Sequence, residues 1–344
     1  MSINGSLHGF FEGKRGLRQG DPLSPILFVL CIEYLSRILV MVGEKKEFKF
    51  HPRCADSKLN HLCFADDIIL CCKGEFKSVH MLMQDSSCSL FPLRILDMIG
   101  FSRGSFPFRY LGIPICSKKI SVADCEKIVE KMCAKIKSWS SKNLSFAGRL
   151  TLVQSVLMTI QTYWTQIMIL PKSIFKNFNN ICRCFLWKGV ADYSSPGKVA
   201  WKQLCRPKNE GGLGLVNLNL WNLAAMGKHV WMIATKRENI WVRWVHSVYI
   251  KGENWLDCSP KNTDSWYWRS IRHVRDLMKV HLSEAQLCSI QKYSIKKAYC
   301  KLILPVAEKV YWASAVWSRL AQAKHIFITW LAILERLNTK DRLR

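Results

Sequence analysis

The sequence predicts an α+β fold in which a mixed first part is followed by a largely helical second part. Residues 1–115 carry turn signals and short apolar runs of strand length, whereas later stretches repeat apolar residues at helical spacing. All fourteen tryptophans lie at or after Trp139, so the composition also changes along the chain. With 344 residues the chain is long enough for two domains or one large one.

The charge of the chain narrows the class of partner. The formal net charge is +26, from 51 basic and 25 acidic residues. An excess of this size indicates a polyanionic partner, first a nucleic acid and second an anionic membrane, although a solvated basic surface is an alternative. The start of the chain does not resemble a signal peptide, and the apolar run 26–32 is too short to span a bilayer. We therefore expect nucleic acid and no membrane.

The fifteen cysteines do not form a zinc or disulfide pattern. No C-x-x-C pair occurs, and the closest sets, Cys71-Cys72 and Cys182-x-Cys184, suit a tetrahedral zinc site poorly. We expect free thiols in a reducing compartment. Whether that compartment is the nucleus or the cytoplasm is left open by the sequence.

The first helix is expected from Pro25 to Leu39. Ser24 can cap its N-terminus, and Pro25 suits the first helical position. A basic, glycine-punctuated loop precedes it. The next feature is a hairpin, in which the apolar runs 62–64 and 68–72 flank Ala65-Asp66-Asp67 and place two carboxylates at the tip.

Three helices are expected in the second part. They run from about Cys125 to Trp139 after a cap at Ser121 or Asp124, from Ser145 toward Met168, and from Ser173 to about Trp187. The apolar residues that should face the core are Ile128, Met132, Ile136 and Trp139 in the first of these helices, and Ile174, Phe178, Ile181 and Phe185 in the last. Lysines 127, 131 and 135 share another face. Basic outer faces suit a clamp on a nucleic-acid backbone, and a solvated surface explains each helix equally well.

Asp66 and Asp67 are the candidate catalytic residues. Adjacent carboxylates repel each other unless a cation lies beside them, and Mg²⁺ prefers oxygen ligands. Phosphoryl transfer to a growing chain uses two such ions about 4 Å apart. An ordinary Asp-rich turn is the alternative for the dipeptide alone.

Three motifs in order resemble one family. Residues 64–67, F-A-D-D, resemble the F/Y-x-D-D signature of reverse transcriptases. Upstream, residues 16–28 resemble the loop and helix that precede this signature, and downstream residues 108–115 resemble the R-Y-L-G element of LINE-type enzymes. The chain thus resembles a plant LINE-type, or non-LTR retrotransposon, reverse transcriptase.

The resemblance extends over most of the chain and implies an organisation. It implies a partial palm over 1–115, a helical thumb over 116–200, a helical connector over 201–285 and the start of a reverse-transcriptase zinc-binding domain over 286–344. Residues 139–150 and 181–188 are similar to thumb segments, and residues 207–214 are similar to a P-K-x-x-G-G-L-G linker.

The resemblance also implies roles for single residues, with Mg²⁺ as cofactor and an RNA template and DNA primer as partners. Asp66 would be a direct metal ligand and Asp67 its electrostatic partner. Template and nucleotide contacts would come from Arg15, Arg18, Gln19 and Gly20, and a primer grip from Tyr110, Leu111 and Gly112.

Three departures from the family pattern lead us to expect an inactive or strongly impaired polymerase. The family has a further catalytic Asp ahead of the Gln19-Gly20 loop, and none of the eighteen residues before that loop is Asp. No Asn-x-x-Lys occurs between Lys77 and Tyr110, where the family carries one. The family's zinc ligands lie beyond Arg344, so we expect no zinc in this chain. The alternative function is a non-catalytic protein that binds RNA or DNA through its basic thumb.

Overall fold

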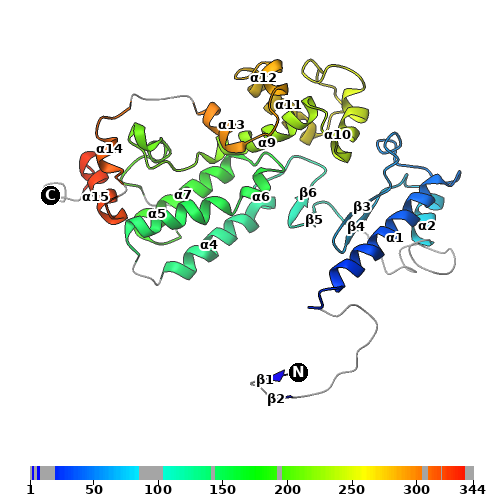
Figure 1. Cartoon of the computed structure of the whole chain (residues 1–344), viewed down its shortest axis with the longest axis horizontal. Helices are drawn as coiled ribbons and strands as arrows, with labels where there is room; N and C mark the ends of the chain where they lie inside the picture. Colours follow the sequence, from blue (N-terminus) through cyan, green and yellow to red (C-terminus); the bar gives the residue numbers. More distant parts are fainter. Residues whose placement is uncertain are drawn as a thin grey trace. The chain divides into compact units, whose positions relative to one another are not determined.

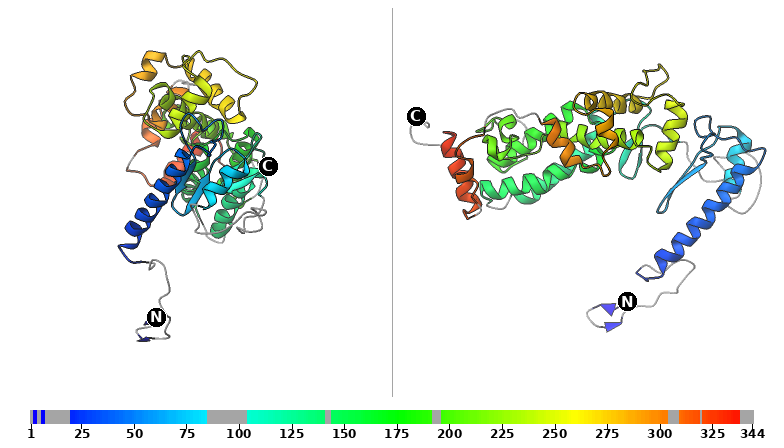
Figure 2. Two further views of the ribbon diagram at one scale, coloured as in Figure 1. Left: turned by 90° about the vertical axis from the view of Figure 1, so that its right-hand side faces the viewer. Right: turned by 45° about the horizontal axis from the view of Figure 1, so that its top comes forward.

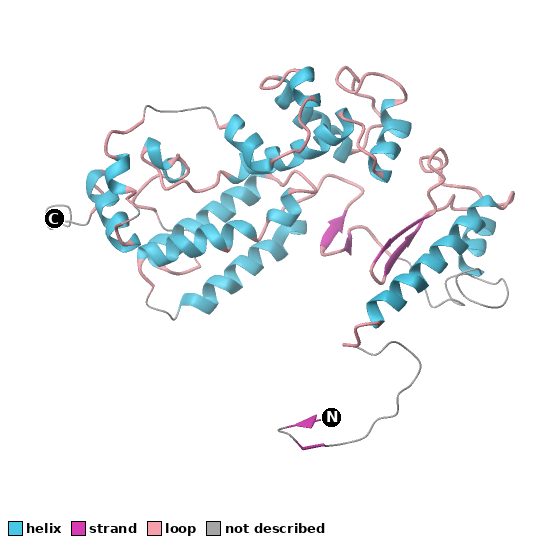
Figure 3. Cartoon of the chain, viewed as in Figure 1, coloured by secondary structure: helices cyan, strands magenta, loops and turns pink. Residues whose placement is uncertain are grey.

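The computed structural model describes residues 2–3, 6–7, 20–84, 104–140, 144–191, 196–303, 309–318 and 320–337. They belong to two compact units, each described by itself below (Figure 1). The first unit comprises 1–103 and 239–251, and the second 104–238 and 252–344. Helices predominate, and the strands pair only in two-stranded sheets among these residues (Figure 3). The mixed fold class is as expected, whereas the division into palm, thumb and connector stays a prediction.

The described residues of the first unit form one long helix, two antiparallel strand pairs and a few short helices. Its elements are β1 (Ser2–Ile3), β2 (Ser6–Leu7), α1 (Ser24–Glu44), β3 (His61–Phe64), β4 (Asp67–Leu70), α2 (Phe76–Gln84), α10 (Ile240–Val245) and the π-helix η4 (His246–Ile250). A small core joins α1, α2 and the loop after α1, and its buried residues are Leu39, Val42, Phe48, Met81 and Leu82.

Helix α1 is longer than expected, and its start differs. It is a continuous helix of 21 residues, seen end to end in the right-hand view of Figure 2. Ser24 is its first helical residue and not the cap; Leu23 occupies the N-cap position without a side-chain cap bond, and its N–H donates to the Asp21 carboxylate at 2.8 Å. By length and composition alone α1 could cross a membrane, and no other described helix meets that test. Leu39 and Val42 of α1 are buried, but only 11% of its apolar window is buried among the described residues, so the apolar stretch is longer than the run 26–32 considered from the sequence.

The segment 239–251 packs within the first unit although it comes much later in the sequence. The indole N–H of Trp244 donates to the Arg53 carbonyl at 2.7 Å, and the Arg53 guanidinium donates to the Tyr249 hydroxyl at 3.4 Å. An aromatic pair therefore holds the loop that leads into the hairpin.

The second unit is almost entirely helical. Its strands are β5 (Phe108–Tyr110) and β6 (Ile113–Ile115). Its main helices are α4 (Glu126–Ser140), α5 (Phe146–Ser155), α6 (Thr162–Thr165), α7 (Lys172–Lys188), α9 (Leu218–Ala234) and α11 (Trp266–Lys279). Shorter helices are α8 (Trp201–Leu204), α12 (Glu284–Cys288), α13 (Ile295–Leu302), α14 (Ala313–Val316) and α15 (Ala323–Ile333), with 3₁₀ turns η1 (Ala123–Cys125), η2 (Leu157–Thr159) and η3 (Lys208–Glu210).

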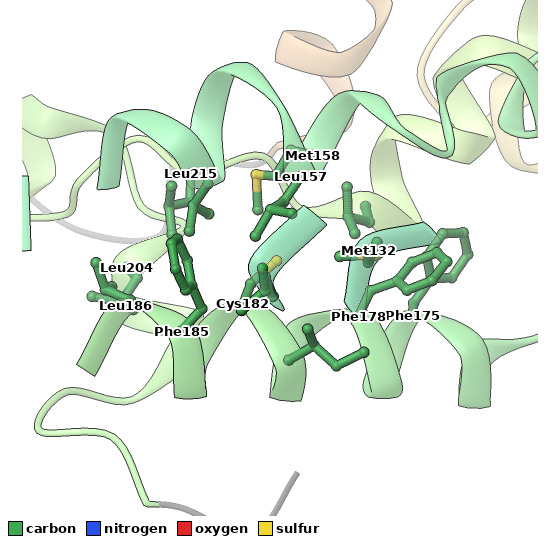
Figure 4. Close-up of a cluster of buried hydrophobic side chains, with 14 of the residues drawn as sticks. Met132, Leu157, Met158, Phe175, Phe178, Cys182, Phe185, Leu186, Leu204 and Leu215 are labelled. Atoms are coloured by element: carbon green, nitrogen blue, oxygen red, sulfur yellow. The ribbon is translucent and has the colours of Figure 1, made fainter. Parts of the chain in front are cut away.

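Helix α7 is the centre of the core, as its periodicity predicts. Its apolar face points toward Leu157 and Met158 of the α5–α6 region (Figure 4). All four residues predicted to face inward, Ile174, Phe178, Ile181 and Phe185, are buried. The prediction for α4 is also confirmed, since Ile128, Met132 and Ile136 are buried and Trp139 packs against the same core.

The single helix expected from Ser145 to Met168 is wrong, because the chain breaks into α5, η2 and α6. Ser145 does cap α5, accepting from the Gly148 N–H at 3.2 Å. Beyond it, hydroxyls on Thr151, Ser155 and Thr159 donate to carbonyls three or four residues earlier. Such bonds compete with the helical ladder and bend helices. The buried side chain of Gln161 then donates to the Met158 carbonyl at 2.6 Å, which stabilises the break.

The cysteines of the described residues are all free thiols. Burial raises the pKa of Cys125 and of Cys205 to about 12, which keeps both thiols protonated and unreactive at neutral pH. Cys125 is buried, whereas Cys31, Cys288 and Cys300 are exposed, so the described thiols are not all shielded from solvent.

Candidate functional site

The acidic pair lies at the tip of the β3–β4 hairpin. The register pairs Phe64 with Asp67, so Ala65 and Asp66 form a two-residue turn. Ala65 has a φ of +50°, the left-handed conformation that tight hairpin turns require. Asp67 is therefore the first residue of β4, one position further from the tip than the sequence suggests. Both carboxylates are exposed.

The base of the hairpin is tied to α1. The Asn60 side-chain amide donates to the carbonyl of Leu39, and Asn60 is buried. His61 lies 2.7 Å from the Ser36 hydroxyl through Nε2 and 2.7 Å from the Asn60 side-chain oxygen through Nδ1. Burial lowers the pKa of His61, so its ring is neutral at pH 7. Sequence reasoning did not find these anchors, because each depends on a partner more than twenty residues away.

A close approach between α1 and the chain leading into the hairpin requires Gly43. A Cβ on this residue would lie 2.9 Å from Cζ of Phe50 and 3.1 Å from the Asn60 amide nitrogen. Its place inside a helix is costly by propensity, at roughly 1 kcal/mol relative to Ala. Close packing against the anchor of the hairpin explains it.

The donor set at the tip fits a divalent cation only in part. Two exposed carboxylates are hard oxygen ligands of the kind that Mg²⁺ accepts together with water. A two-ion centre needs carboxylates from more than one direction, and within the described ranges no three His, Cys, Asp or Glu side chains gather closely enough to hold a metal ion. The described residues thus present two carboxylates from a single turn.

The element expected to grip the primer forms a second tight hairpin, β5–β6. Leu111 and Gly112 form its turn, with φ values of +50° and +78°. The Arg109 guanidinium donates to the Gly112 carbonyl at 3.4 Å across this turn. The hairpin belongs to the second unit, so its position relative to Asp66 is not determined, and the role of Tyr110, Leu111 and Gly112 stays a prediction.

Of the predicted template-binding residues, only Gly20 lies among those the structure describes. Gly20 is exposed and has a φ of +91°, a conformation that strongly favours glycine. Arg15, Arg18 and Gln19 fall outside the described residues.

Comparisons with known proteins place these features in a family. Residues 1–87 match the family described as reverse transcriptase (RNA-dependent DNA polymerase), and residues 293–344 match the family described as zinc-binding in reverse transcriptase. The first match contains the whole Asp66 hairpin and α1. The two matches occur in the order that the resemblance implies.

Three proteins of Arabidopsis thaliana are similar to parts of the chain. One, named provisionally as a ribonuclease H protein, is 33% identical over 163 residues, which cover 46% of this chain and 26% of that protein. Two uncharacterized mitochondrial proteins are 29% identical over 122 residues and 47% identical over 66 residues. These alignments cover 35% and 19% of this chain, and 79% and 54% of the relatives. The chain thus spans about a quarter of the first relative's length and about half of the last one's.

These findings define the class of protein. The chain is a reverse-transcriptase-like protein of a retroelement. It is of plant type, and its last residues fall in the reverse-transcriptase zinc-binding region.

The zinc-binding match qualifies the expectation that zinc plays no part, because a zinc-binding family covers residues 293–344. A structural zinc site takes four Cys or His ligands. This range contains one cysteine and one histidine, Cys300 and His325, and both are exposed. The residues present therefore do not fit a zinc ion by themselves.

Proposed function

We propose that this protein comes from an RNA-directed DNA polymerase lineage. The Asp66–Asp67 turn would contribute two carboxylates to its nucleotidyl-transfer site. The exposed pair of carboxylates on a hairpin anchored to α1 carries this proposal. A bound Mg²⁺ ion would help to activate a primer 3′-hydroxyl and neutralise the leaving pyrophosphate. The chain's own contribution is to present Asp66 and Asp67 at a fixed tip.

We further propose that a polypeptide of residues 1–344 does not polymerise by itself. Carboxylates on one turn approach metal ions from one side, and the described residues bring no further acid to that turn.

Primer extension tests the second statement, and any extension that occurs also tests the role of Asp66. The polypeptide would be incubated with an RNA template, an annealed DNA primer, deoxynucleotides and Mg²⁺, beside the Asp66→Ala variant. We expect no product above that of the variant. Robust extension that disappears in Asp66→Ala would show an active enzyme and would contradict the second statement.

A second function, nucleic-acid binding without catalysis, is favoured by the exposed lysine row on α4. Lys127, Lys131 and Lys135 are all exposed, one helical turn apart, while the opposite side of the helix is buried. Three cations along about 12 Å of helix can approach several phosphates of one nucleic-acid strand. Binding without extension would support this function.

A further inference from the structure

The region that matches a zinc-binding family has an unexpected set of contacts in the second unit. Its described part contains α13, α14 and α15, and each is attached to the rest of the unit by an aromatic side chain with a polar tip. These contacts do not depend on the acidic hairpin or on the proposed function.

The loop 204–215 receives two of the helices. The indole N–H of Trp330 donates to the Gly211 carbonyl at 2.9 Å, and that of Trp317 donates to the Lys208 carbonyl at 3.0 Å. The Lys208 ammonium lies 4.9 Å from the centre of the Trp317 ring, a cation–π distance. The Val310 N–H donates to the Asn209 carbonyl at 2.9 Å. Successive backbone carbonyls of one loop thus accept hydrogen bonds from one C-terminal segment.

The shape of this loop depends on its glycines. A Cβ on Gly212 would lie 2.1 Å from the Arg206 carbonyl oxygen, far closer than real side chains come. Gly211 has a φ of +83°, and a Cβ there would contact the Trp312 ring at 3.3 Å. The loop closes on itself through hydrogen bonds from Leu213 and Leu215 to the Leu204 carbonyl. The P-K-x-x-G-G-L-G motif is therefore a loop of defined shape whose carbonyls accept hydrogen bonds from tryptophan side chains, rather than a flexible connection.

Helix α13 is attached in the same manner to α9. The Tyr293 hydroxyl donates to the Ala224 carbonyl at 2.7 Å, and the Tyr299 hydroxyl accepts from the Asn217 N–H at 2.8 Å. Gly227 makes room for this packing, because a Cβ there would lie 2.4 Å from the Tyr293 oxygen.

Burial shows that these contacts build a shared core. Trp330 is fully buried, and Phe327 stacks on Phe146 of α5 with ring centres 5.7 Å apart. Small zinc modules need a metal because they cannot bury enough apolar surface alone. This segment obtains its apolar surroundings from α5, α7 and the loop 204–215 instead.

We propose that residues 293–303, 309–318 and 320–337 are a docked part of the helical unit, held by Tyr293, Tyr299, Trp317 and Trp330 on α9 and the loop 204–215, and that zinc plays no part in the docking. The tryptophan anchors take the structural role that the metal has in a zinc module.

Hydrogen exchange measured by mass spectrometry on the whole chain tests the metal part of the proposal. Samples would contain either EDTA or added zinc chloride, and bound zinc would be measured by elemental analysis. We expect the same amide protection in α13 and α15 under both conditions. Loss of that protection in EDTA, or stoichiometric bound zinc whose removal releases α15, would overturn the proposal.

Two substitutions test the anchors from opposite sides of the contact. Trp330→Phe removes an indole hydrogen bond, and Gly212→Ala deforms the loop without touching the segment. Each should raise exchange in residues 323–333 about tenfold or more, the effect expected for a buried hydrogen bond, while α4 and α7 stay protected and report that the unit is folded.

The controls are Trp139→Phe and Gly74→Ala. Trp139 packs against Phe185 in the same core, and its indole donates no hydrogen bond within the described part of the chain. A Cβ on Gly74 meets nothing within 4 Å. Exchange in 323–333 that is equal in Trp330→Phe and Trp139→Phe would contradict the anchoring role, as would an unchanged segment in Gly212→Ala.

Discussion

At the scale of single residues, Asn222 shows how one buried amide can define a turn. Its side chain accepts from the Leu170 N–H at 2.9 Å and donates to the carbonyls of Thr165 and Met168 at 2.7 and 2.9 Å. All three partners lie where α6 ends and the chain turns toward Pro171. Asn222 is only 1% exposed, so water cannot replace the lost bonds in a variant.

We expect Asn222→Ala to lower the free energy of unfolding by about 3 kcal/mol, because three buried backbone groups lose their partner. Urea denaturation followed by tryptophan fluorescence measures this change. Asn219→Ala is the control on the same helix, since only the Asn219 backbone N–H takes part in the cap. Equal effects of the two substitutions would show that the amide network contributes little.

Tyr267 gives the protein a sensitivity to alkaline pH. Burial raises the pKa of its phenol to about 12, above the ordinary value of about 10. The folded state therefore favours the protonated phenol. Its contribution to stability is complete below pH 10 and is lost as the pH rises from 10 through 12.

We expect wild type to lose about 1 kcal/mol more stability than Tyr267→Phe between pH 9 and pH 11, since phenylalanine cannot ionise. Urea midpoints of both proteins at the two pH values measure the difference. An equal loss of stability in the two proteins would mean that groups other than Tyr267 cause the alkaline sensitivity.

At the scale of elements, α1 leaves much of its apolar surface uncovered by the described residues. Its exposed large apolar side chains are Ile26, Leu27, Val29, Leu30, Tyr34, Val40 and Met41, several of them about 60% exposed. Contiguous apolar surface of this kind promotes association in water. Leu39 and Val42, which hold α1 to its own unit, lie on another face.

We therefore expect the triple substitution Ile26→Gln, Val29→Gln and Leu30→Gln to reduce self-association while leaving the core of the first unit intact. Sedimentation velocity measures the association, and circular dichroism checks the helix. The conservative set Ile26→Val, Val29→Ile and Leu30→Met is the control. Association that is unchanged by the glutamine variant would mean that another surface is responsible.

The sequence patterns predicted correctly those elements that depend on residues within the element itself. The burial of α4 and α7 follows from apolar residues at helical spacing, and the hairpin follows from two short apolar runs around a polar tip. The turn that follows α6 was not predicted, because it depends on Asn222, some fifty residues away. The acidic pair was found from its sequence, whereas its anchors Asn60 and His61 were not, since no periodic pattern marks a side chain that bonds to a distant helix.

At the scale of the whole molecule, the charge of +26 predicts binding that weakens steeply with salt. If the α4 lysine row contacts phosphates, replacing Lys127, Lys131 and Lys135 by Gln should reduce the slope of log affinity against log salt by about 2 to 3. Fluorescence anisotropy with a labelled RNA–DNA hybrid between 50 and 200 mM salt measures it.

The matched control is Lys296→Gln, Lys297→Gln and Lys301→Gln on α13. These lysines are also exposed, and the change in net charge is the same. A smaller change of slope in this variant would support a specific contact at α4. Equal slopes in both variants would indicate a diffuse electrostatic attraction with no defined α4 contact.

The late position of residues 239–251 has a consequence for synthesis on the ribosome. Trp244 and Tyr249 complete the surroundings of Arg53, yet they emerge only after the whole stretch 104–238 has been made. At ordinary translation speeds this delay is on the order of ten seconds. During that interval the nascent hairpin loop lacks its aromatic cover, so we expect ribosome-associated chaperones to bind the loop only until residues 239–251 have emerged.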